Sequence, residues 1–220
     1  MEYFDIIIIG VIGMIAAIII KVIKDRVKNY KKSLRGKVGE KLILEQLEMM
    51  PDTLVFKNLY LPLNMQKRTY TEIDIVAINK AGIYVIESKN FNGEIHGSRD
   101  AENWIQSLGG KDYEFYNPIL QNNLHCMVLG YRIPKYEKYI KPVVVFGDNA
   151  DIRGVYNGHG KYRVINTSDL YDIMMEELEM CKQKLSKQDI NEIKYVVEKY
   201  TNVSREVKRK HKERIKKKYK

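Results

Sequence analysis

The chain has 220 residues, 45% of them hydrophobic, which is enough for one medium-sized domain with a buried core plus appended segments. Its two cysteines, Cys126 and Cys181, exclude a scaffold built on several disulfides and fit a reducing compartment. The formal net charge of +10 is consistent with a nucleic-acid partner and with an anionic membrane, and does not decide between them.

Residues 1–23 are predicted to form a transmembrane anchor. The run from Phe4 to Ile23 is apolar all round, with Asp5 and Lys21 only near its ends. At a rise of about 1.5 Å per residue it matches a hydrocarbon core of roughly 30 Å. The alternatives are a cleaved signal peptide, which would need a basic start and a small-residue cleavage site, and a buried soluble helix. The basic segment that follows favours the membrane.

The distribution of charge predicts the orientation of this anchor. Lysines and arginines follow the span from Lys21 onward, whereas none precedes it. By the positive-inside rule, the chain is a single-pass protein of the cell membrane, with its N-terminus outside and its C-terminal domain in the cytoplasm. Residues 24–35 then form a basic juxtamembrane linker, whose default role is attraction to anionic lipid headgroups.

The main domain is expected over residues 36–166. Apolar residues recur at helical spacing from Val38 to Met50 until Pro51 ends the pattern, and Leu54–Leu61 reads as a first strand. Glu40 lies on the predicted helix among apolar positions. The ordinary interpretation of such an acid is a solvent-facing side chain.

A β-hairpin is predicted within Thr71–Asn90, with strands over Glu72–Ile78 and Ile83–Lys89. Alternate residues of a strand share a face, so each strand carries charge on an otherwise apolar face. The residues predicted to share these two faces are Glu72, Asp74, Val76 and Ile78 on the first strand, and Ile83, Val85, Glu87 and Lys89 on the second. A buried carboxylate is costly unless it is paired or bound to a metal, which marks this end of the hairpin as a candidate site.

The residue types indicate metal-assisted hydrolysis of a phosphodiester. Asp74 and Glu87 are suited to one hard divalent cation, Mg²⁺ or Mn²⁺, with positions left for water and a phosphate oxygen. Lys89 is placed to orient the attacking water or to offset charge on the phosphate. The alternative is a half-exposed hairpin on which Glu87 and Lys89 are ordinary surface charges.

The later segments complete an α/β or α+β sandwich around a mixed sheet. Trp104 is expected to fill the core rather than to stack on a base. Asn117 and Pro118 predict the start of a helix that runs to about Arg132 and carries Gln121 and His125 one turn apart on one face. Gln121 is placed to hydrogen-bond water or phosphate near the metal, and His125 to contact phosphate without transferring a proton. Buried strands are predicted at Pro142–Phe146 and Tyr162–Ile165.

Two helices are expected over residues 167–206, the second beginning at Ser186. Residues 207–220 then form a basic tail, with nine lysines and arginines from Lys208 onward, expected to be exposed or disordered. Two interpretations remain open for this tail. It either binds the phosphates of nucleic acid or lies on the anionic inner leaflet.

Several short motifs occur in a fixed order along residues 36–146. They are Gly36-Lys37-Val38-Gly39-Glu40, Glu72-Ile73-Asp74, Ile86-Glu87-Ser88-Lys89-Asn90 with Gly93, Trp104, and Asn117-Pro118-Ile119-Leu120-Gln121. Together they resemble the NERD (nuclease-related) domain, which is similar to the PD-(D/E)XK nuclease superfamily. The resemblance implies a restriction-endonuclease-like mixed sheet flanked by helices. It also implies Asp74 and Glu87 as metal ligands, Lys89 as the catalytic lysine, Glu40 as an accessory acid and Gln121 as a further site residue.

Three functions are consistent with these patterns. The first is a membrane-anchored nuclease that cleaves DNA or RNA with Mg²⁺ or Mn²⁺. The second is a membrane-tethered module that binds nucleic acid without significant catalysis. The third is a membrane-surface scaffold whose basic ends bind anionic lipid. The pair of acids on the hairpin favours the first, because a module that only binds phosphate has no need of carboxylates there.

Overall fold

The computed structural model describes residues 36–64, 66, 69–156, 163–182 and 184–218, preceded by residues 14, 18–22, 24 and 26. Most of the predicted anchor, Phe4–Ile23, and of the linker, residues 24–35, lies outside these described residues. Within the described part of the chain, no helix has the length and apolar character needed to cross a bilayer. The chain divides into two compact units, Met1–Val38 and Gly39–Lys220, and all described strands belong to the second.

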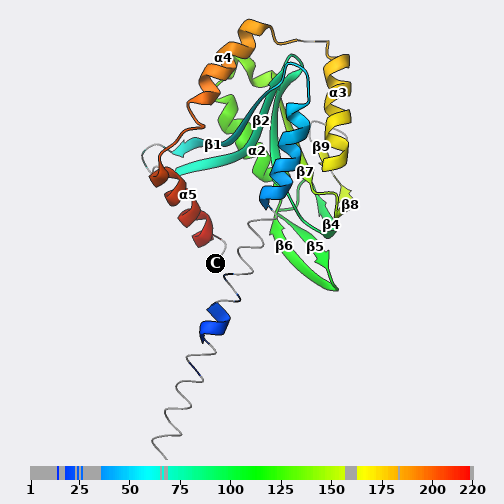
Figure 1. The fold of residues 1–220 in the computed structure, drawn as a ribbon, viewed down its shortest axis with the longest axis vertical. Coiled ribbons are helices and arrows are strands. Elements are labelled where there is room, and N and C mark those ends of the chain that lie inside the picture. The colour runs from blue at the N-terminus through cyan, green and yellow to red at the C-terminus, as the bar shows by residue number, and fades with distance from the viewer. Residues whose placement is uncertain are drawn as a thin grey trace, which may run out of the picture. The chain divides into compact units, whose positions relative to one another are not determined.

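A five-stranded mixed sheet forms the centre of the second unit (Figure 1). In spatial order its strands are β1 (Leu54–Asn64), β2 (Thr69–Asn79), β3 (Gly82–Lys89), β7 (Ile140–Phe146) and β9 (Arg163–Asn166). The first three are antiparallel, whereas β7 runs parallel to β3 and β9 parallel to β7. A parallel pair needs a long crossover, and helix α2 (Pro118–Gly130) lies within the one between β3 and β7. The predicted hairpin, helix and buried strands are therefore confirmed.

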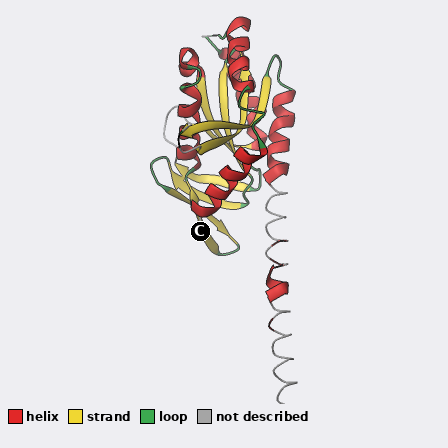
Figure 2. Ribbon diagram, turned by 90° about the vertical axis from the view of Figure 1, so that its left-hand side faces the viewer, coloured by secondary structure: helices red, strands yellow, loops and turns green. Residues whose placement is uncertain are grey.

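Helices lie on both sides of this sheet (Figure 2). On one face, α2 and α4 (Lys187–Glu198) pack against apolar residues of β2 and β3 that include Val76 and Val85. On the other face, the helix of residues 36–48 and α3 (Leu170–Met180) pack against residues that include Ile86. Because both faces are buried, these strands are nearly continuous apolar runs in the sequence, and a charged residue within them has to find a partner.

The alternation predicted for β2 is only partly correct. Val76 and Ile78 pack on the α2 face, but so does Ile73, and Thr71 is hydrogen-bonded to α2. Glu72, between Thr71 and Ile73, therefore points away from α2, and the prediction that it shares one face with Val76 and Ile78 is wrong. The physical reason lies in β1, where Asn58 has a φ of 54° and interrupts the ladder across from Asp74.

A second, four-stranded sheet is not predicted by the sequence analysis. Its spatial order is β6 (Lys111–Tyr116), β5 (Asn103–Leu108), β4 (Gly93–Ser98) and β8 (Ala150–Tyr156). Trp104 is completely buried beneath it and stacks on Phe146 with ring centroids 6.3 Å apart. The prediction that Trp104 fills the core is confirmed. The single mixed sheet of the prediction is replaced by two sheets, each with parallel and antiparallel pairs.

The C-terminal segment was expected to be an exposed or disordered tail, and over its described residues it is a largely exposed helix rather than a disordered segment. Helix α5 (Arg205–Lys218) follows α4 and lies against β2. Most of its described side chains are exposed, but His211 is buried among residues of β1 and β2. Although α5 has no apolar stripe, His211 attaches it to the domain through Tyr60 of β1 and the carbonyl of Tyr70 on β2. The predicted start of α4 is confirmed, since Ser186 and Asp189 form a reciprocal capping box.

Candidate nuclease site

The register of the central hairpin places two carboxylates side by side. Ile75 of β2 pairs with Ile86 of β3, so the next residues along the two strands are Asp74 and Glu87. The backbone amide of Ser88 donates a hydrogen bond of 2.9 Å to Oδ2 of Asp74. This bond holds the Asp74 side chain of β2 against β3, next to Glu87 and Lys89.

Glu87 is buried and accepts hydrogen bonds from three side chains. Nζ of Lys89 lies 2.6 Å from Oε1, and Nε2 of Gln121 lies 2.7 Å from the same oxygen. Nε2 of His125 lies 3.2 Å from Oε2. Lys89 also donates to Oε1 of Gln121 at 3.1 Å, which closes a triangle of lysine, glutamate and glutamine. The predicted site residues Glu87, Lys89 and Gln121 are therefore in direct contact.

Helix α2 holds Gln121 and His125 in place through two asparagines. Asn117 caps the helix by accepting a hydrogen bond of 2.8 Å from the amide of Ile119, and its own amide group donates to three carbonyls of the β4–β5 connection. One turn on, Asn122 donates to the carbonyls of Val85 on β3 and Val143 on β7. The helix is thereby fixed to both parallel strands, with its polar face toward Glu87.

Electrostatics set the two carboxylates apart. Burial raises the pKa of Asp74 well above its usual value, and repulsion from Glu87 raises it further, more than the charge of Lys89 and the Ser88 amide lower it. Burial also opposes ionisation of Glu87, but Lys89 and His125 outweigh it and lower the pKa of Glu87 to about 2. One carboxylate is thus stabilised as an anion by its donors, while the other is charged only at a cost.

Glu40 approaches this pair from the helix of residues 36–48. Its carboxylate is near enough to contribute to the raised pKa of Asp74. The close approach depends on Gly39, because a Cβ at that position would lie 2.9 Å from Cβ of Asn90, the residue after Lys89. Gly147 meets the other side of the same residue, where an added Cβ would lie 2.5 Å from Oδ1 of Asn90. Two glycines therefore allow the helix and the end of β7 to close around the end of β3.

The sequence analysis did not identify what His125 does. The side chain is buried, with Nδ1 3.0 Å from Oγ1 of Thr71 and Nε2 facing Glu87. It is therefore a positioning residue for Glu87 rather than a group open to phosphate. The sequence did indicate which face of the helix His125 lies on, because it is one turn from Gln121. Nothing in the sequence paired it with Thr71.

The oxygens that suit a hard divalent cation come from Asp74 and Glu87, with Glu40 nearby. Within the described residues, no group of three or more histidines, cysteines and acids forms a complete metal-binding cluster. The two carboxylates nevertheless fit a cation, because one of them has a pKa raised by burial and by the other's charge. A bound cation would offset that repulsion.

Comparison with known proteins identifies the family of this chain. A Bacillus anthracis protein described as uncharacterized is 26% identical over 190 residues, which cover 84% of this chain and 85% of that protein. The family model of the nuclease-related domain, NERD, matches residues 35–147, which include the helix that carries Glu40, the hairpin and α2. The matched range is more than half of the chain and contains every predicted site residue. The chain therefore belongs to the NERD, or nuclease-related domain, family.

Proposed function

We propose that this protein is a metal-dependent nuclease that hydrolyses phosphodiester bonds of DNA or RNA. The observation that carries the proposal is the pairing of Asp74 and Glu87 on adjacent strands, with Lys89 and Gln121 both bonded to Glu87. Burying two acidic side chains together with a lysine and an amide costs folding free energy, so a purely structural role does not account for this cluster. The mixed sheet with helices on both faces supports a restriction-endonuclease-like core.

Asp74 and Glu87 would hold one Mg²⁺ or Mn²⁺ ion. Oδ2 of Asp74 accepts the Ser88 amide, and within the described residues no hydrogen bond reaches its Oδ1, which leaves that oxygen for a ligand. When bound, such an ion supplies Lewis acidity at a phosphate oxygen and lowers the pKa of a coordinated water. Glu40, already within electrostatic range of Asp74, adds a third acid at the edge of the site.

Lys89, Gln121 and His125 would prepare the carboxylates for this role. Lys89 offsets the charge of Glu87. Its ammonium group would interact with a phosphate oxygen or with the attacking water. Gln121 bonds both Lys89 and Glu87, and so fixes their relative orientation. His125 fixes the remaining oxygen of Glu87 from the buried side.

The proposal includes attachment to the cell membrane through Phe4–Ile23, with the nuclease-like domain in the cytoplasm. What supports it is the apolar run itself and the lysines and arginines that follow it. The basic linker of residues 24–35 would then lie against anionic headgroups. Tethering would confine cleavage to nucleic acid that reaches the inner membrane surface.

The competing function is a membrane-tethered module that binds nucleic acid without significant catalysis. One observation favours it: both oxygens of Glu87 are already occupied by hydrogen-bond donors. In that case Glu87 would be a structural anion that holds Lys89 and α2 together, and metal would have no effect on the protein.

Cleavage of end-labelled substrates by the full-length chain in detergent distinguishes the two. Single- and double-stranded DNA and RNA would be incubated with Mg²⁺, with Mn²⁺ and with EDTA, for the wild type and for Asp74→Asn and Lys89→Met. Glu94→Gln, which removes an exposed acid of β4, is the matched control. Cleavage that needs metal, is lost in both site variants and survives in the control supports the nuclease. Binding of every substrate without cleavage supports the module.

A further inference from the structure

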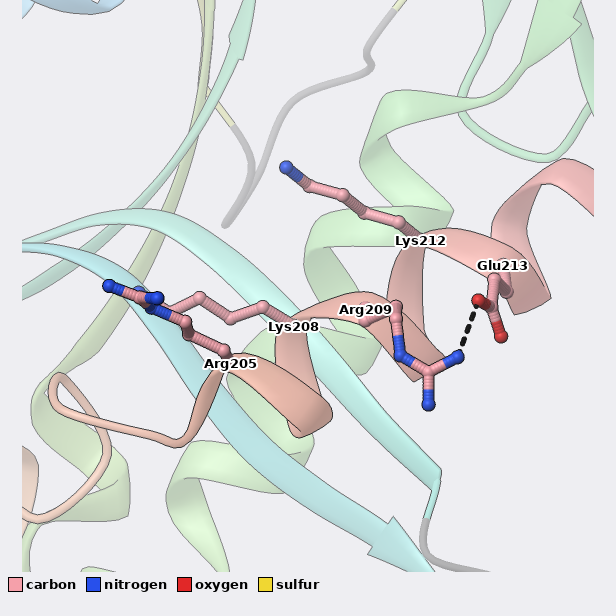
Figure 3. A pocket seen from close by; sticks show the side chains of 5 residues that line it. All are labelled: Arg205, Lys208, Arg209, Lys212 and Glu213. Carbon is pink, nitrogen blue, oxygen red and sulfur yellow. Dashed lines mark hydrogen bonds and ion pairs between the residues drawn. The ribbon is translucent and has the colours of Figure 1, made fainter.

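Helix α5 concentrates positive charge on a folded element. Its fourteen residues include nine lysines and arginines and two glutamates. Arg205, Lys208, Arg209 and Lys212 follow one another at positions i, i+3, i+4 and i+7, which places them along one flank of the helix. Together with Glu213 they line an open hollow of about 400 Å³ (Figure 3). We call this the α5 flank.

Three cations of the flank have no carboxylate partner among the residues that the structure describes. Arg209 turns to Glu213 and pairs with it at 2.9 Å, whereas the side chains of Arg205, Lys208 and Lys212 extend away from this pair (Figure 3). Within the part of the chain that the structure describes, no carboxylate forms an ion pair with any of these three. Like charges gathered without counter-ions repel one another, so an anionic partner would be bound with a gain in stability.

The helix is held beside the carboxylate site. Nδ1 of His211 lies 3.0 Å from the carbonyl oxygen of Tyr70, and its Nε2 lies 3.6 Å from Oε2 of Glu72. The ring of Tyr60 meets His211 edge-on at 5.7 Å, and the hydroxyl of Tyr60 donates to Glu72. The anchor of α5 therefore involves β2 within a few residues of Asp74.

Two further observations bring the flank close to the site. Nζ of Lys208 lies 5.6 Å from the ring centroid of Tyr60. Burial and the bond to Glu72 raise the pKa of Tyr60, and the charges of Asp74 and Glu40 raise it further. The tyrosine beneath Lys208 is thus within the electrostatic field of the candidate metal ligands.

We propose that the α5 flank binds the phosphate backbone of the nucleic acid and guides it to the site of Asp74 and Glu87. The inference rests on the proposed function and names the surface that delivers its substrate. Position favours nucleic acid over anionic lipid as the occupant. Because α5 is anchored at Tyr70 and Glu72, a polyanion bound on the flank would lie within a few residues of the carboxylates where cleavage is proposed. A single lipid headgroup would make no use of that position. Arginine and lysine in a row bind successive phosphates without reading sequence.

Salt-dependent binding of full-length protein to fluorescent DNA and RNA oligonucleotides, without metal, tests the flank. The variant Arg205→Gln/Lys208→Gln/Lys212→Gln keeps helix propensity and removes three cations. The control Lys182→Gln/Lys184→Gln/Lys187→Gln removes the same charge from exposed positions in the α3–α4 connection and at the first residue of α4. Loss of three phosphate contacts should reduce the slope of log K against log salt by about 2 to 3. The control should keep the wild-type slope.

Three results would overturn the proposal. The first is equal slopes for the two triple variants. The second is an unchanged slope for the flank variant combined with reduced preference for anionic over zwitterionic vesicles, which would assign the flank to lipid. The third concerns the variant Arg205→Lys/Lys208→Arg/Lys212→Arg, which keeps all three charges. A slope that regains less than half of the difference between the flank variant and the wild type would contradict the proposal. Because no cleavage is measured, an inactive wild type leaves this test intact. If the wild type cleaves, the flank variant should raise KM and leave kcat unchanged.

Discussion

The amide of Ser88 donates a hydrogen bond to Asp74 across the β2–β3 hairpin, at 2.9 Å, and so holds one carboxylate beside another. A single backbone hydrogen bond does not compensate for burial next to Glu87, and the pKa of Asp74 remains raised. The ionised form of Asp74 therefore lowers the free energy of unfolding. The pairing of Asp74 with Glu87 can for this reason be tested by measurements of stability as well as of activity.

Replacing Asp74 with asparagine should stabilise the protein while removing cleavage. In the unfolded chain an aspartate has a pKa of about 3.9, whereas the folded value is raised. Between the two values the folded state binds more protons, so the stability of the wild type falls as pH rises through this window. Asp74→Asn escapes that loss. Its melting temperature should exceed that of the wild type by roughly 3 to 5 °C for each pKa unit of the shift.

The pH dependence provides the control for this prediction. The advantage of Asp74→Asn should be absent below about pH 4, where Asp74 is protonated in both states, and should grow as pH rises through the folded pKa. Thermal melts of both proteins across that range, with Glu94→Gln beside them, measure it. A variant that is less stable than the wild type at neutral pH would show that Asp74 is not held at a cost.

Mg²⁺ or Mn²⁺ should raise the melting temperature of the wild type. A ligand that binds only the folded state at about 100 times its dissociation constant adds roughly 2.7 kcal/mol. For a chain of this size that corresponds to a rise of about 5 to 10 °C. Asp74→Asn and Glu87→Gln should lose most of this effect, and EDTA should reverse it in the wild type. Equal shifts in wild type and both variants would place the metal elsewhere.

The sequence predicted those parts of the site whose signal is local. The charged residues of the hairpin stand out against the apolar residues next to them in the sequence. Asn117 and Pro118 lie directly at the start of the helix that they predict. The second sheet was missed because β5 and β6 are polar and largely exposed, so they lack a clear apolar pattern. One local signal was available, since Gly109 and Gly110 adopt φ of 61° and 73°, as a two-residue hairpin turn requires.

Other features depend on contacts between distant parts of the chain. His125 is bonded to Thr71, 54 residues away, and His211 to the carbonyl of Tyr70, 141 residues away. No spacing rule connects such pairs. The sequence likewise predicted a tail in place of α5. The attachment of this helix depends on one histidine and on a tyrosine from β1 rather than on an apolar stripe.

The contact between Thr71 and His125 should control metal affinity. Thr71→Val keeps the side-chain shape but removes the hydroxyl bonded to Nδ1 of His125, so the imidazole loses its hold on Glu87. Loss of an outer partner of this kind typically weakens metal binding by about 10- to 100-fold. Thr71→Ser keeps the hydroxyl and should remain within a few-fold of the wild type. Titration of Mn²⁺ by calorimetry compares the three proteins, and equal affinities for the two variants would contradict the role given to His125.

The two glycines at the start of the helix of residues 36–48 should respond oppositely to alanine. At Gly36 an added Cβ has no neighbour within 4 Å, so Gly36→Ala should leave stability unchanged or slightly raised. At Gly39 the added Cβ would meet Asn90, and the helix that carries Glu40 must move away from the end of β3. Gly39→Ala should therefore lose about 1 to 3 kcal/mol of folding free energy and reduce cleavage.

A double-mutant cycle with Asn90→Gly identifies the cause. Asn90→Gly removes the atoms that the new methyl group would strike, so in the Gly39→Ala background it should restore part of the lost stability, although alone it should destabilise. Denaturant unfolding of the four proteins gives the coupling energy. If the two changes are simply additive, the lack of a side chain at Gly39 is not what makes room for Asn90. The placement of Glu40 beside Asp74 would then need another explanation.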